Sequence, residues 1–105
     1  MLDAGFEPRT VCRKVGESAV RTFDGETVLV PLASGIADVD SIFVMNAVGA
    51  AIWELVDGAR SVTAISDALA ERFDVSPEQA LADAREFLGE LAGARLVDVV
   101  QAPPR

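Results

Sequence analysis

Two β-prone segments flank an Asp24-Gly25 pair, and this arrangement constrains the fold more than any other feature of the sequence. The segments cover residues 19–23 and 26–32 and contain several β-branched side chains. An Asp-Gly pair between two such segments is the strongest short-range signal for a β-hairpin. Residues 40–45 predict a third strand, because they are β-branched and aromatic and too few for a helix.

The hydrophobic period changes after residue 46 and predicts three helices. They cover residues 47–56, 61–73 and 76–93. We expect Asn46, Ser61 and Ser76 to cap their N-termini, with Gln79 at the capping-box position of the third helix.

The order of these elements predicts an α+β fold in which a three-stranded antiparallel sheet is followed by three helices. We expect residues 33–38 to be a connecting loop and residues 96–100 to be a short last strand. Residues 18–100 then form the folded domain. Residues 1–17 are expected to be an irregular N-terminal arm, with a short extended piece at residues 10–14 and an incidental Cys12. Residues 101–105 are expected to be a frayed tail.

Composition argues against several classes of function. The chain has a net charge of −8, which disfavours nucleic acids and anionic membrane surfaces. It contains no histidine and a single cysteine, so common zinc and copper sites and the catalytic triads cannot be assembled from it. The phosphate-binding glycine motifs are also missing. We therefore expect a non-catalytic protein without a cofactor or metal.

The same data bear on location. The chain has no apolar run long enough to span a membrane, and its first eight residues lack the basic and apolar regions of a secretory signal. A single cysteine agrees with a reducing compartment. The expected location is the cytoplasm.

From residue 26 to residue 97 the chain resembles the PqqD-like family, the peptide chaperones also called RiPP precursor-peptide recognition elements. The segments that carry the resemblance are residues 28–31, 43–46, 49–55, 57–58, 61–62, 71–75, 82–83, 87–91 and 94–97. The resemblance implies a winged helix-turn-helix-like fold without catalysis. It further implies that the protein binds the leader segment of a ribosomally synthesised precursor peptide and presents it to a modifying enzyme such as a radical-SAM protein, a protease or a cyclase.

The resemblance also implies a place for the peptide, which adds as an antiparallel strand to the third strand and lies against the third helix. The candidate binding residues are Ser41, Ile42, Phe43, Val44, Met45, Ala80, Asp83, Ala84 and Phe87. By the two-residue period of a strand, Phe43 and Met45 face the core while Ile42 and Val44 face the other way. The alternative to a groove formed by the two alanines and Phe87 is a helix that is simply well buried.

Three other interpretations stay open at this point. A winged-helix topology suggests a transcription regulator, although the third helix carries four acidic residues and only one arginine. Asp40-Ser41-Ile42 is similar to the phosphopantetheine site of carrier proteins, but strand-like rather than helical residues follow it. An unpaired edge strand would also permit a homodimer.

Overall fold

The Asp24-Gly25 pair turns the chain between β2 (Glu17–Phe23) and β3 (Glu26–Ala33) in the computed structural model, which describes residues 6–33, 36–37 and 42–100. Asp24 and Gly25 have φ angles of 51° and 83°. Two consecutive positive φ angles are typical of the type I′ turn, whose twist matches that of the flanking strands. β2 and β3 pair antiparallel along their length, so the predicted hairpin is confirmed.

The third position in the sheet is shared by two short strands. β4 (Ile36–Ala37) and β5 (Phe43–Met45) both pair antiparallel with β3, on the edge opposite β2. The prediction that residues 33–38 form a connecting loop was wrong for Ala33 and for β4. β3 continues to Ala33, and its last two residues pair with β4. The third strand is also shorter than predicted: Ile42 precedes it, and residues 40 and 41 lie outside the described residues.

Three helices follow, α1 (Ala47–Leu55), α2 (Val62–Phe73) and α3 (Pro77–Gly93). The three predicted N-caps are confirmed, since the side chains of Asn46, Ser61 and Ser76 each accept a hydrogen bond from the backbone N–H three residues on. The capping box is not completed. Gln79 donates its side-chain amide to Asp83 at 2.8 Å instead of reaching back to the cap.

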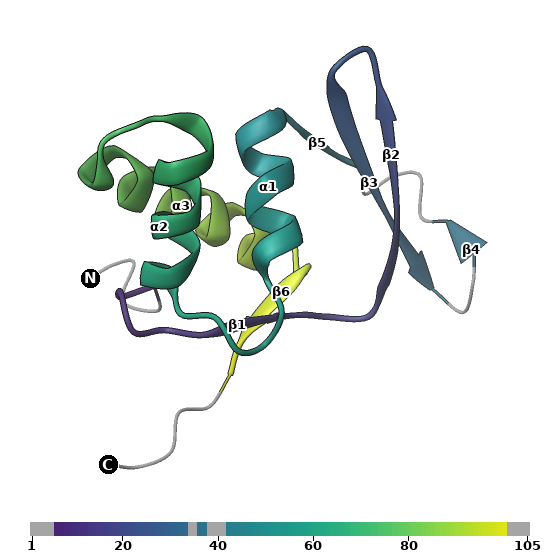
Figure 1. Ribbon diagram of the computed structural model, residues 1–105. Helices are drawn as coiled ribbons and strands as arrows, with labels where there is room; N and C mark the ends of the chain where they lie inside the picture. The colour runs from purple at the N-terminus through teal and green to yellow at the C-terminus, as the bar shows by residue number, and fades with distance from the viewer. Residues whose placement is uncertain (1–5, 34–35, 38–41, 101–105) are drawn as a thin grey trace.

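The two ends of the described chain meet beneath the helices (Figure 1). β1 (Cys12–Lys14) pairs antiparallel with β6 (Val97–Val99). The extended piece expected at residues 10–14 and the last strand expected at residues 96–100 are thus confirmed, whereas their pairing with each other was not expected. Cys12 is only 1% exposed, and its carbonyl accepts a hydrogen bond from the backbone of Gly58, so it belongs to the core rather than to a loose segment.

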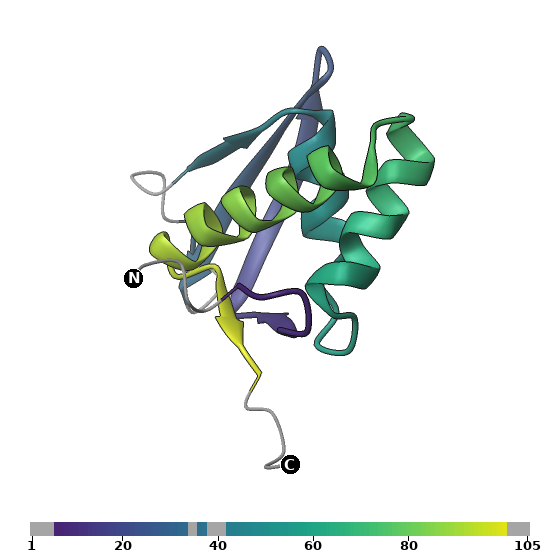
Figure 2. The same ribbon diagram turned by 90° about the vertical axis from the view of Figure 1, so that its left-hand side faces the viewer.

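A single hydrophobic core joins the sheet to the helices. It contains Leu29 and Met45 from the sheet, and its helical members include Ile52, Leu69 and Leu88. In Figure 2, α3 runs across the molecule in front of the β2–β3 hairpin. No helix within the described ranges has the length and apolar character needed to cross a membrane. The predicted α+β class is confirmed, with the helices packed beside an antiparallel sheet.

Candidate functional site

A groove of about 370 Å³ lies between β5, the first half of α1 and the middle of α3. Three elements that are separate in the sequence thus form its walls. Its lining residues are Val44, Met45, Asn46, Val48, Gly49, Ile52, Asp83, Glu86, Phe87 and Glu90.

β5 borders this groove with one edge available. The strand pairs with β3 on its other side, and no further strand among the described residues pairs with it. Its side chains alternate as predicted: Met45 is 1% exposed, Phe43 is partly buried against the core, and Val44 is 58% exposed. An edge strand of this kind leaves backbone N–H and C=O groups available for pairing with an extended chain.

The rings of two aromatic residues connect β5 to α3. The rings of Phe43 and Phe87 meet edge to face, with centroids 5.7 Å apart and planes inclined by 64°. This is a favourable arrangement for two aromatic side chains. It holds the ring of Phe87, which lines the groove, against β5.

The two alanines expected to line the groove do not lie in it. Ala80 and Ala84 are both 0% exposed and belong to the core, and neither is among the residues that line the groove. Their small side chains permit close contact between the packed elements, which is a structural role. The interpretation of Ala80 and Ala84 as a groove floor was therefore wrong, whereas Asp83 and Phe87 do line the groove.

The groove contains residues that the sequence alone did not single out. Val48, Gly49 and Ile52 contribute the wall from α1, and Glu90 extends the wall from α3 beyond Asp83 and Glu86, the two acidic residues that the sequence suggested could meet basic residues of a leader. The spacing of three and four residues between the acidic side chains signals one helical face. The contribution of α1 has no comparable signal, because it depends on how the helix packs against β5.

The alternatives can now be weighed against the structure. α3 carries Glu78, Asp83, Glu86 and Glu90 against Arg85, a charge that a DNA duplex would repel. Ser41 lies outside the described residues, but the chain that follows it enters strand β5 rather than the helix that a carrier-protein serine begins. Within the part of the chain that the structure describes, no cluster of three or more Cys, Asp or Glu side chains could hold a metal ion.

The helices beside a hairpin and an edge strand define a winged helix-turn-helix-like α+β domain with a groove along its sheet edge. The family model described as coenzyme PQQ synthesis protein D (PqqD) matches residues 26–97. The chain therefore belongs to the PqqD family. The PqqA binding protein of Rhizobium meliloti (strain 1021) is 36% identical to it over 77 residues, which cover 73% of this chain and 71% of that protein.

Two solved structures share the fold. One is the solution NMR structure of the PqqD truncation of Methylobacterium extorquens PqqCD, described as a stand-alone RiPP recognition element. It has a TM-score of 0.70, 25% identity, and coverage of 93% of this chain and 99% of that one. The other is TbiB1 in complex with the TbiA(beta) leader peptide, with a TM-score of 0.64, 27% identity, and coverage of 87% and 99%. The fold prediction is thus confirmed in both its class and its winged-helix topology.

Proposed function

We propose that this protein binds the leader segment of a ribosomally synthesised precursor peptide and presents it to a modifying enzyme. The protein itself catalyses no reaction and acts in the cytoplasm. The modifying enzyme is a radical-SAM protein, a protease or a cyclase. The observation that carries the proposal is the available edge of β5 next to the groove. It is supported by membership of the PqqD family and by the similarity to a PqqA binding protein and to a protein solved with its leader peptide.

The available edge of β5 supports binding of the leader by strand addition. The leader adds as an antiparallel strand along residues 41–45, where main-chain hydrogen bonds supply affinity and are indifferent to sequence. Side chains on one face of the added strand then enter the groove beside Phe87 and Asp83. Contacts in the groove supply the specificity that the backbone cannot.

An NMR titration tests the proposal. The probe is a synthetic PqqA peptide, the partner named for the Rhizobium meliloti relative, added to ¹⁵N-labelled full-length protein. We expect the amide signals of Phe43, Val44 and Met45 to shift together with those of α3 residues near Phe87. Absence of any shift, or shifts confined to the β2–β3 hairpin, would contradict the proposal. The same edge is open to a second copy of the chain, so sedimentation with and without the leader reports whether dimer and peptide compete.

A pair of tryptophan variants tests the groove itself. Val48 is partly buried and lines the groove, whereas Ala47 next to it is exposed and does not. Val48→Trp should fill the groove and weaken leader binding at least tenfold, while Ala47→Trp should leave the affinity unchanged. Thermal unfolding of both variants verifies that they are folded. An unaltered leader affinity in folded Val48→Trp would refute the groove as the binding site.

A further inference from the structure

The wall of the groove contributed by α3 is acidic, and the remaining walls are apolar or uncharged. Asp83, Glu86 and Glu90 lie three and four residues apart on the side of α3 that lines the groove. From β5 and α1 come apolar side chains, together with Asn46, whose side-chain oxygen is engaged in capping α1. Among the described residues that line the groove, none is a lysine or an arginine.

This charge distribution determines which peptides the groove can bind. Surface carboxylates are ordinarily solvated and contribute little on their own. Three of them along one wall, in a chain of net charge −8, give the groove a negative potential that repels an acidic segment and attracts a basic one. Phe87 and Val48 present apolar surface to the groove, so contact with them requires an apolar side chain in the same guest.

The spacing of the carboxylates fits an extended guest. In the view of Figure 2 the axes of α3 and β5 lie roughly parallel, with the chain running in opposite directions along them, and both elements line the groove. Glu86 and Glu90 are four helical residues apart, which is about 6 Å along the axis. Side chains two residues apart on one face of a strand are separated by about 6.7 Å. Two basic side chains at positions i and i+2 of an added strand therefore match these two carboxylates.

From this arrangement we infer that the protein recognises a leader segment that combines apolar side chains with lysine or arginine two positions apart on the face toward α3. The inference rests on the proposed function and specifies its guest. The basic side chains pair with Asp83, Glu86 and Glu90, and an apolar side chain packs on Phe87. The pairing makes binding dependent on ionic strength, because such exposed ion pairs are screened by salt.

A selection experiment with short random peptides displayed on their mRNA tests this inference. The bait is the immobilised full-length protein, in parallel with a groove variant, Asp83→Asn/Glu86→Gln/Glu90→Gln. The matched control is Glu26→Gln/Asp67→Asn/Glu71→Gln, which changes the charge equally at exposed residues outside the groove. Circular dichroism verifies that all three baits are folded.

We expect the wild type and the control to select peptides enriched in lysine or arginine at i and i+2 next to apolar residues, and the groove variant to lose this enrichment. Individual selected peptides should bind the groove variant about fivefold more weakly at low salt, and added salt should narrow the difference. Selection of peptides without basic enrichment, or equal enrichment by the groove variant, overturns the inference and leaves the proposed function intact. If no bait selects peptides and the PqqA peptide causes no NMR shifts, the proposed function fails as well.

Discussion

The ring of Phe87 in α3 lies directly over Gly49 in α1. A Cβ atom built at residue 49 would come within 2.9 Å of Cζ of Phe87 and 3.3 Å of Cβ of Met45. The absence of a side chain at residue 49 is therefore what allows α1 to approach the Phe87 ring. Because Gly49, Met45 and Phe87 all line the groove, this contact also sets its shape.

Replacement of Gly49 by alanine should destabilise the protein although alanine favours helices. We expect the free energy of unfolding to fall by about 1–2 kcal/mol, since the added methyl group must displace Phe87 from its contact with Phe43. Gly89→Ala is the matched control, because a Cβ at residue 89 meets no atom within 4 Å. That variant should gain about 0.5–1 kcal/mol from helix propensity alone. Urea unfolding measures the free energy of unfolding of both variants. A similar stabilisation in the two would show that the contact between the added methyl group and Phe87 does not destabilise the protein.

Enlargement of Ala84 should affect the fold rather than the groove. Ala84 is 0% exposed, so Ala84→Leu should lower the free energy of unfolding by about 1–3 kcal/mol through overpacking. Ala82→Leu, on an exposed position of the same helix, should change it by less than about 0.5 kcal/mol. Chemical unfolding measures the free energy of unfolding of Ala84→Leu and Ala82→Leu. Equal stability of the two variants would mean that residue 84 has free space beside it, as a groove residue would.

The helices and the hairpin could be predicted because their signals are local. Asn46, Ser61 and Ser76 each lie next to the helix that they cap, and Asp24-Gly25 lies between the strands that it joins. Such signals involve residues a few positions apart, which a single sequence displays directly. The class of the fold followed from their order.

The pairing of β1 with β6 could not be predicted, because its partners lie at opposite ends of the chain. An extended piece at residues 10–14 and a last strand at residues 96–100 were both expected, but three residues per strand give too short a pattern to identify the partner of either. The burial of Cys12 follows from that pairing and was missed with it. The error on Ala80 and Ala84 has a related cause. A small side chain on a helix serves a groove or a close packing contact equally well, and only the neighbouring element decides between them.

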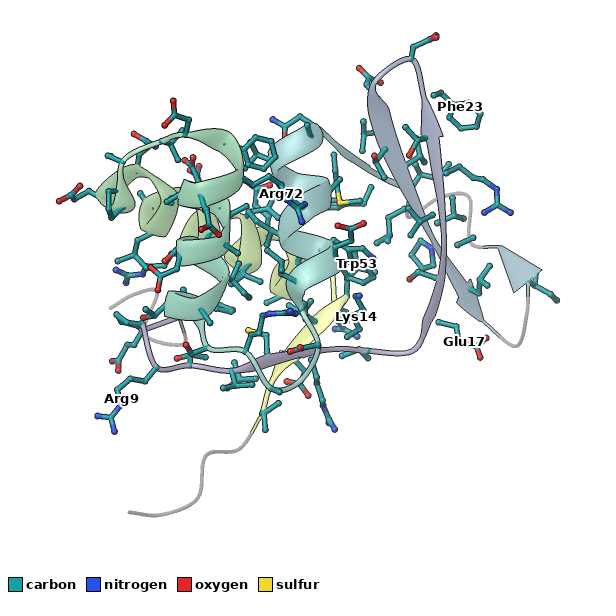
Figure 3. All side chains as sticks on the ribbon, viewed as in Figure 1. Arg9, Lys14, Glu17, Phe23, Trp53 and Arg72 are labelled. Carbon is teal, nitrogen blue, oxygen red and sulfur yellow. The ribbon has the colours of Figure 1, made fainter. Side chains whose placement is uncertain are left out.

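Lys14 should stabilise the fold through Trp53. Its Nζ lies 4.9 Å from the centroid of the Trp53 ring, and Trp53 is only 7% exposed (Figure 3). Partial burial lowers the pKa of Lys14, opposed by the charges of Glu54 and Asp57. Lys14→Met keeps the aliphatic stem and removes the charge, so we expect a loss of about 0.5–1 kcal/mol. Trp53 is the single tryptophan, and its fluorescence should change in the same variant. Unchanged fluorescence and unchanged stability would exclude a cation–π contribution.

The buried thiol of Cys12 should make stability depend on pH in the alkaline range. Burial raises the pKa of Cys12 above its ordinary value of 9.0, and the charge of Asp98 raises it further. Below the ordinary pKa the thiol is neutral in both the folded and the unfolded chain and contributes no pH dependence. Above it the unfolded chain releases its proton while the folded chain retains it, so stability is lost as the pH rises toward the folded pKa.

Urea unfolding in a reducing buffer between about pH 7 and pH 10 measures this loss, with Cys12→Ala as the reference. The stability difference between the wild type and Cys12→Ala should be constant up to about pH 8 and shift against the wild type above about pH 9. The lowered pKa of Lys14 acts in the opposite direction but is common to both proteins, so it cancels in the difference as long as the cation–π contact is retained. A difference that stays constant to pH 10 would mean that the folded protein ionises Cys12 as readily as the unfolded chain does, and that the β1–β6 pair does not shield it.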